Sequence, residues 1–376
     1  MMKRVAIAAG CVLMAATCGH GAAVSGEATA DITLKEELVG GERTVVMENA
    51  CFQSTMIPGK AMLPATYLYK PTGHDVFLRR ARLEQSFESL DGLYDCLPWV
   101  GDAKKRGASK GLLRTATWEV ATQVVDGAAT ARFATEIAYP DFTTGKTNRL
   151  AFAKTISGSR GRAQLRMDYE VENVGREAAK FILVGHGRVA AGGTYSRGDY
   201  VYVRGTNCWL AEFKWPALEK AGAKPYSWAA WPVEGVMDFA PKSGAEAKGE
   251  YVYAFVPASW AAVGDEEGRE YTIFQCSPIR LGQAVLPMPY WCVLHRDGDY
   301  ILELSLSRNL DAGNWDESWA TVTLEPGAKA TFTVHMTPGQ GLGKADFEKV
   351  TEISPARLVV EGKEVPMGGN GGEAGR

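Results

Sequence analysis

The sequence of 376 residues predicts an all-β protein, organised as a single large antiparallel β-sandwich with few short helices. Segments that alternate between apolar and polar side chains recur over roughly 300 residues, with no linker-like break between them. Helical periodicity is confined to the short segments 215–221 and 344–351. The 42 glycines supply the turns that many short strands require.

The clearest strand is predicted over residues 163–172, where apolar and polar side chains alternate without exception from Leu165 to Glu172. A period of two places Leu165, Met167, Tyr169 and Val171 on one buried face. The same reasoning predicts further strands over 44–49, 117–125, 181–185, 199–204, 250–256, 271–275, 300–306, 320–324 and 330–336.

Residues 1–23 have the pattern of a signal peptide. Lys3 and Arg4 give a positive start, a short apolar run follows, and the small residues before position 24 suit cleavage. Cys18 leaves open a lipoprotein, acylated at that cysteine after cleavage. We expect export to the periplasm or the extracellular space, either free or held by a lipid anchor.

Residues 30–353 are expected to form the sandwich, and residues 354–376 a C-terminal tail that is disordered from about residue 368. The apolar run of the leader is too short to span a bilayer as a mature helix, and no other segment is long and apolar enough. We therefore expect no membrane span.

Charge and cysteine usage exclude several classes of function. The net charge of -3, with no basic cluster interleaved with aromatic residues, argues against a nucleic-acid partner. Five cysteines remain beyond the leader, none in a CxxC pair, which disfavours structural zinc. No two histidines are spaced as metal ligands, so we expect neither a metal nor a cofactor.

Segments 91–101 and 110–119 combine glycines with the side chains that a sugar site needs. Trp99 and Trp118 are candidate stacking platforms for the apolar face of a sugar ring, and Asp95 and Arg114 are candidate partners for its hydroxyls. The alternative is that the indoles pack in the core and that Arg114 pairs with Asp95 or Glu119. Glu212, near Trp215, is a candidate for an additional subsite.

The order of several segments resembles the galactose mutarotase-like superfamily, whose members share an aldose 1-epimerase-like β-supersandwich. The resemblance covers roughly residues 40–340. It is carried by Met47–Asn49 with Met56–Gly59, Asp91–Gly101, Gly111–Arg114 with Trp118, Leu150–Ile156 with Leu165–Asn173, Val184–Gly187, Tyr300–Glu303 and Leu324–Gly327.

The resemblance implies a carbohydrate ligand on a concave sheet face, and a reaction that interconverts the α and β anomers of a sugar. Glu303 would be the base that removes the proton of the anomeric hydroxyl, and His186 the acid that protonates the ring oxygen. The alternatives are a turn role for His186, between two glycines, and a solvent-facing Glu303 on an edge strand.

The sequence departs from the family pattern at Lys110, which stands where the family carries its first histidine. An ammonium group can donate to a sugar hydroxyl, but its ordinary pKa of about 10.4 makes it a poor proton shuttle near neutral pH. Lys110 therefore favours the alternative of a non-catalytic carbohydrate-binding or accessory protein. A polysaccharide lyase is disfavoured because the chain has no helical domain.

Overall fold

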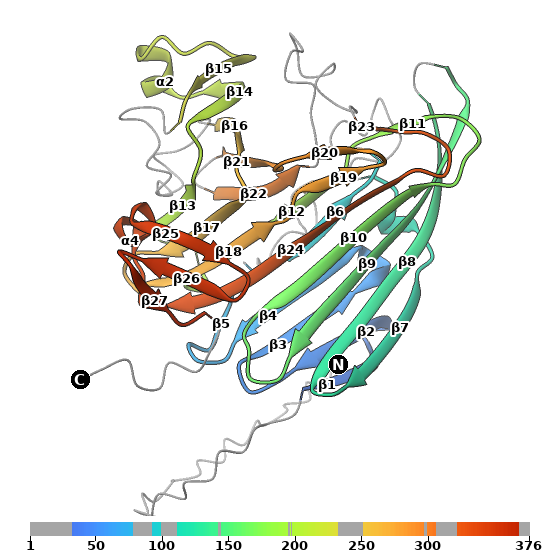
Figure 1. Ribbon diagram of the computed structural model, residues 1–376, viewed down its shortest axis with the longest axis horizontal. Coiled ribbons are helices and arrows are strands. Elements are labelled where there is room, and N and C mark those ends of the chain that lie inside the picture. The colour runs from blue at the N-terminus through green and yellow to red at the C-terminus, as the bar shows by residue number, and fades with distance from the viewer. Residues whose placement is uncertain are drawn as a thin grey trace, which may run out of the picture.

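The computed structural model describes residues 32–77, 92–98, 111–141, 144–194, 196, 198–231, 251–296, 299–305 and 322–367. Two large antiparallel sheets face each other and form a sandwich, with short helices only at its periphery (Figure 1). The all-β class predicted from the sequence is confirmed.

The first sheet, sheet A, has twelve strands. Its strands, in order across the sheet, are β1 (Thr33–Val39), β2 (Glu42–Glu48), β3 (Phe52–Ile57), β4 (Met62–Tyr69), β6 (Leu93–Cys96), β12 (Val184–Gly187), β22 (Asp299–Ser305), β21 (Tyr290–Arg296), β16 (Tyr251–Pro257), β14 (Asn207–Lys214) and β15 (Ser227–Ala230), with β5 (His74–Asp75) beside β4. Strands distant in sequence therefore meet at the centre of this sheet, around β12.

The second sheet, sheet B, has ten strands. Its main path runs through β13 (Asp199–Val203), β17 (Trp260–Asp265), β18 (Glu270–Cys276), β24 (Lys329–Gln340), β10 (Leu165–Asn173), β9 (Thr147–Ser159), β8 (Ala128–Pro140) and β7 (Glu119–Val125), with β19 (Ile279–Leu281) on β24 and β20 (Ala284–Leu286) on β19. The strand predicted over 163–172 is β10, and its four apolar side chains are all buried.

Small elements complete the fold. They are the pair β11 (Ala179–Phe181) and β23 (Val322–Leu324), the sheet β25 (Val350–Ser354), β26 (Arg357–Val360) and β27 (Lys363–Val365), the helices α2 (Pro216–Lys220) and α4 (Lys344–Glu348), and the 3-10 turns η1 (Pro58–Lys60) and η2 (Leu113–Thr115). Both helices lie where the sequence predicts them. Strands β26 and β27 fall within the segment expected to be a tail, so the fold continues to Val365.

Within the part of the chain that the structure describes, no helix has the length and apolarity needed to cross a membrane.

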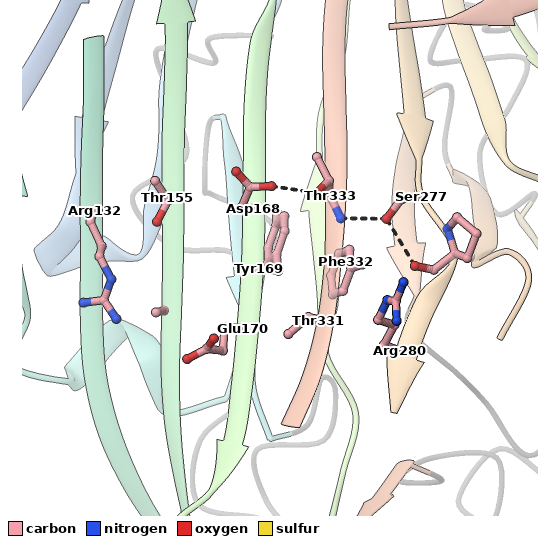
Figure 2. Close-up of a pocket in the computed structure, with 12 residues that line it drawn as sticks. Arg132, Thr155, Asp168, Tyr169, Glu170, Ser277, Arg280, Thr331, Phe332 and Thr333 are labelled. Carbon is pink, nitrogen blue, oxygen red and sulfur yellow. Dashed lines mark hydrogen bonds between the residues drawn. The ribbon is translucent and has the colours of Figure 1, made fainter. Parts of the chain in front are cut away.

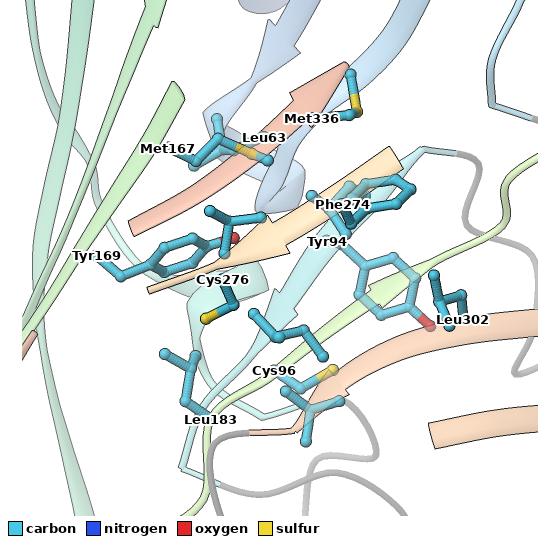
Figure 3. Packing of buried hydrophobic residues seen from close by; sticks show 14 of the residues in the cluster. Leu63, Tyr94, Cys96, Met167, Tyr169, Leu183, Phe274, Cys276, Leu302 and Met336 are labelled. Carbon is cyan, nitrogen blue, oxygen red and sulfur yellow. The ribbon is translucent and has the colours of Figure 1, made fainter. Parts of the chain in front are cut away.

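Apolar side chains fill the space between the two sheets, as Figure 3 shows around Tyr169, Phe274 and Leu302. A second cluster forms where Phe347 of α4 packs beside Tyr271 and Trp260 of sheet B. All five cysteines beyond the leader are buried and pack as small hydrophobic side chains.

One ion pair lies inside this apolar core and joins the two sheets. The ammonium of Lys154 on β9 donates to Asp95 Oδ2 on β6 at 2.8 Å, and the Tyr169 hydroxyl donates to Asp95 Oδ1 at 3.2 Å. Both charged side chains are at most 1% exposed. Burial raises the pKa of the Asp95 carboxyl and lowers the pKa of the Lys154 ammonium, each against the attraction of its partner.

Removing one charge of this pair should destabilise the protein far more than removing both. Lys154→Met or Asp95→Asn leaves one uncompensated buried charge and should each lower the free energy of unfolding by about 3–5 kcal/mol. The double variant buries no charge and keeps an acceptor for Tyr169, so it should be more stable than either single variant. Urea unfolding measures all three.

The matched control is Arg357→Gln, which removes an exposed ion pair with Glu352 and should cost less than about 1 kcal/mol. A double variant as unstable as the sum of the two single variants would contradict a coupled buried pair.

Candidate functional site

His186 lies at the centre of sheet A on β12, between strands β6 and β22. Its direct partners in the two ladders are Tyr94 on β6 and Glu303 on β22. Residues directly opposite one another in antiparallel strands belong to the same face of the sheet. The fold therefore brings together His186 and Glu303, the two residues predicted from the sequence to carry the chemistry, although 116 other residues separate them along the chain (303 − 186 − 1).

The face that carries His186 is turned away from the apolar core. Its neighbours Gly185 and Gly187 lie on the core side, where a Cβ atom at Gly185 would contact Asp95 Oδ1 at 3.6 Å and Leu304 Cβ at 3.7 Å. Since side chains alternate along a strand, the imidazole of His186 lies on the other face. Its ring packs against the Tyr94 ring with centroids 4.5 Å apart, and the residue is 6% exposed.

Aromatic residues continue the row that starts at His186. Beyond Glu303 the successive direct partners across the sheet are Cys292, Phe255, Trp209 and Trp228. Trp209 and Phe255 form a buried cluster with Cys292, separate from the main core, and Trp228 on the edge strand is 46% exposed. Five strand spacings separate His186 from Trp228, roughly 24 Å.

The four aromatic residues of this face, Tyr94, Phe255, Trp209 and Trp228, were not identified from the sequence. Tyr94 was hidden beside Asp95, and only the alternation along β6 shows that the two point to opposite faces. In the segment after Asn207 the sequence pointed to Trp215, which instead packs in the main core. The pairing between strands identifies Trp209, and no local pattern does.

The predicted sugar-binding residues are distributed over both sheets. Asp95 lies in the core with Lys154, so it is not part of the site that we propose. Trp118 is half-buried, donates its indole N–H to Leu113 O at 3.1 Å and meets the ring of Phe152 edge-on at 5.9 Å. Glu212 on β14 accepts a hydrogen bond from the Tyr226 hydroxyl at 2.5 Å.

Arg114 lies in the turn η2 and is partly exposed. Its Nε is buried, and no residue that the structure describes forms a hydrogen bond with that atom. The alternative ion pair between Arg114 and Asp95 does not form, because Lys154 forms an ion pair with that carboxylate. Lys110 and Trp99 lie outside the described residues, and of Glu303 the structure describes only the backbone position.

Two glycines of the segments 91–101 and 110–119, Gly92 and Gly111, are required by the backbone conformation. Gly111 has φ +72°, and a Cβ atom there would lie 2.3 Å from Leu97 O. Gly92 has φ +85°, and a Cβ atom there would lie 2.5 Å from Ala65 O. The backbone approaches so closely at both turns that only glycine fits.

Among the residues that the structure describes, no three His, Cys, Asp or Glu side chains gather as metal ligands would.

Comparison with solved structures identifies the fold. The chain is similar to a galactose mutarotase-like protein from Clostridium acetobutylicum, with a TM-score of 0.57 and 12% identity over 83% of this chain and 99% of that chain. A galactose mutarotase related enzyme from Lactobacillus acidophilus matches with a TM-score of 0.52 and 13% identity, over 78% and 97% of the two chains. A galactose mutarotase-like protein from Lactobacillus casei matches with a TM-score of 0.51 and 15% identity, over 79% and 100%.

No protein-family model and no curated protein sequence matches the chain. At these low identities the structural similarity shows the fold alone. The chain has the galactose mutarotase-like fold, as the order of its sequence segments predicted.

Replacing Gly111 by alanine should destabilise the protein severely, by at least about 3 kcal/mol, because a backbone clash adds to an unfavourable φ. Gly127→Ala is the matched control. Gly127 also has a positive φ of +73°, but a Cβ atom there would meet only the flexible side chain of Arg160, at 3.5 Å. This control should cost about 1 kcal/mol. If urea unfolding gives the same decrease in the free energy of unfolding for both variants, the close approach of the backbone at Leu97 does not contribute.

Proposed function

We propose that the protein binds a carbohydrate on the face of sheet A that carries His186, and that it interconverts the α and β anomers of that sugar. The observation that carries the proposal is the direct pairing of His186 with Glu303 on neighbouring strands. Directly opposite residues have Cβ atoms roughly 4.5–5.5 Å apart. An imidazole and a carboxylate at this spacing can both act on one ring carbon.

The proposed chemistry needs one base and one acid at the anomeric carbon, C1. The Glu303 carboxylate removes the proton of the C1 hydroxyl while the His186 imidazolium gives a proton to the ring oxygen. The bond between C1 and the ring oxygen breaks, and an open-chain aldehyde forms. After rotation about the C1–C2 bond the two residues exchange roles, and the ring closes with the opposite configuration.

The surroundings of His186 support this role. The imidazole is nearly buried and packs on the Tyr94 ring, which restricts its orientation without occupying the register position of Glu303. A fixed orientation reduces the entropy lost when acid, base and sugar align. Along the same row Trp209 and Phe255 are fully buried, whereas Trp228 is 46% exposed and offers a flat surface on which a further sugar ring can stack.

The second candidate function is carbohydrate binding without turnover. Lys110 replaces the histidine that the family carries at this position, and an ammonium is a weaker proton donor and acceptor pair than an imidazole near neutral pH. We also propose that the protein is exported, from the leader-like pattern of residues 1–23. Whether Cys18 is acylated can be read from the mass of the mature protein.

Glu303→Gln and His186→Ala should each abolish catalysed mutarotation, lowering kcat/KM by at least about 100-fold, because the reaction then lacks its base or its acid. The rate of anomer exchange can be followed by NMR or by polarimetry on freshly dissolved aldoses. A broad panel of sugars is needed, since the fold does not identify the substrate.

The control is Glu42→Gln, which makes the same chemical change at a half-buried glutamate on β2 of sheet A. It should leave the rate unchanged. Wild-type protein that adds nothing to spontaneous exchange for any sugar would refute the enzyme and leave the binding protein. Wild-type protein that also binds no sugar would refute both.

A further inference from the structure

The outward face of sheet B carries an open groove, on the opposite side of the sandwich from His186. Two adjoining cavities of about 320 and 590 Å³ form the groove, and both are lined by Arg132, Ala153 and Glu170. Figure 2 shows the first of them, with Arg132 on one side, Arg280 on the other, and Asp168 and Glu170 between. None of these residues belongs to the site proposed above.

Small side chains create the hollow in the larger cavity. Ala134 on β8 and the neighbouring alanines 151 and 153 on β9 form its floor. Carboxylates stand on both sides of this floor, because each of two rows across the sheet starts and ends with a glutamate. The first row is Glu119, Ala134, Ala153 and Glu170, and the second is Glu136, Ala151 and Glu172.

The smaller cavity differs because a second arginine lines it: Arg132 lines both cavities, and Arg280 lines only the smaller one. The guanidinium groups of Arg132 and Arg280 form no ion pair or hydrogen bond with any residue in the described ranges. Other arginines on this face are paired: Arg149 with Glu136 and Arg166 with Asp168. A guanidinium that is available at a groove suits an anionic group, which it can bind in bidentate fashion.

Polar groups also line the smaller cavity. Hydroxyl groups of Thr155, Thr331, Thr333 and Ser277 line it together with the Asp168 carboxylate. His335 follows Thr333 by two residues on β24, and Gln275, on β18, precedes Ser277 by two residues. His335 and Gln275 are direct partners in the ladder between these strands. His335 Nδ1 and Gln275 Oε1 are buried and have no hydrogen-bond partner in the part of the chain that the structure describes, and Gln275 is only 8% exposed.

We propose that this groove is a second carbohydrate-binding site, specific for an oligosaccharide that carries one acidic sugar residue on an otherwise neutral chain. The acidic residue lies in the smaller cavity with its carboxylate on Arg280, while Arg132, which lines both cavities, donates to the hydroxyls of the next sugar residue. The neutral residues lie along the alanine floor, where their hydroxyls donate to Glu119, Glu136, Glu170 and Glu172. An open groove of this length admits a chain rather than one enclosed ring.

The charges exclude the simpler ligands. A wholly neutral oligosaccharide would leave the Arg280 guanidinium of the smaller cavity without an anion. A polyanion, whether a polyuronate or a nucleic acid, would bring negative charge against the larger cavity, where Arg149 and Lys329 compensate only two of the four glutamates, and like charges at this distance repel. Only a ligand with its charge at one position satisfies both cavities.

The test is isothermal titration of the full chain with three tetrasaccharides: cellotetraose, an aldotetraouronic acid with a single uronic acid residue, and tetragalacturonic acid. The aldotetraouronic acid should bind at least tenfold more tightly than the other two. Arg132→Gln and Arg280→Gln should each weaken its binding by about tenfold or more, the effect expected for losing a hydrogen bond to a charged group. Arg43→Gln, which removes an exposed arginine from sheet A, should not weaken it.

His186→Ala separates the groove from the site on sheet A, because it should leave the affinity for the aldotetraouronic acid unchanged. The proposal is overturned if no tetrasaccharide binds, if all three bind equally, or if the polyuronate binds most tightly. It is also overturned if either arginine variant retains full affinity, or if His186→Ala abolishes binding. A failure of mutarotation with intact groove binding would refute only the proposed enzyme.

Discussion

The buried ion pair between Lys154 and Asp95 constrains the rest of the structure, because it can form in only one register of strand β6. Asp95 must point into the sandwich to reach Lys154 on the opposite sheet. Its neighbour Tyr94 must then point outward, where its ring packs on His186. A shift of β6 by one residue would exchange its two faces. The Lys154 ammonium would then lie in apolar surroundings without a counter-ion, and the Tyr94 ring would no longer pack on the His186 imidazole. The interior pair therefore fixes the geometry of the exterior site.

The alternation of side chains along each strand places packing residues on the core face of both sheets and the candidate recognition residues on the outward face. On sheet B, Tyr169 and Phe332 stack in the core with centroids 4.5 Å apart, while their neighbours Asp168 and Thr333 meet in a hydrogen bond of 2.6 Å on the outward face. On sheet A the core side of β12 carries only glycine, and its outward side carries His186. Each strand thus contributes to packing and presents chemistry at once, so the two outward faces can hold unrelated sites on one core.

Local sequence patterns predicted the strands well, because the alternation of side chains is a property of one segment. Contacts between residues on different strands could not be predicted in this way. The alternation of residues 163–172 is a property of that segment alone, and β10 forms there with its apolar face buried. The partner of Asp95 could not be predicted, because Lys154 lies 59 positions away and nothing near either residue marks the pair. Arg114 lies closer to Asp95 in the sequence and was therefore considered as its partner. The contact between Tyr94 and His186 depends in the same way on which strands become neighbours, which is a property of the whole sheet.

The glycines on either side of His186 affect what determines the position of its imidazole. Gly185 and Gly187 put no side chain into the sandwich, and a small apolar cavity of about 20 Å³ lies beside them, lined by Leu302, Leu304 and Trp291. Strand β12 is therefore held by its two ladders and by the ring of Tyr94, and hardly by packing beneath it. Larger residues at these positions would anchor the strand from the core side and tie the position of the imidazole to core packing. With glycine there, the position of His186 follows the neighbouring strands β6 and β22, and β22 is the strand that carries Glu303.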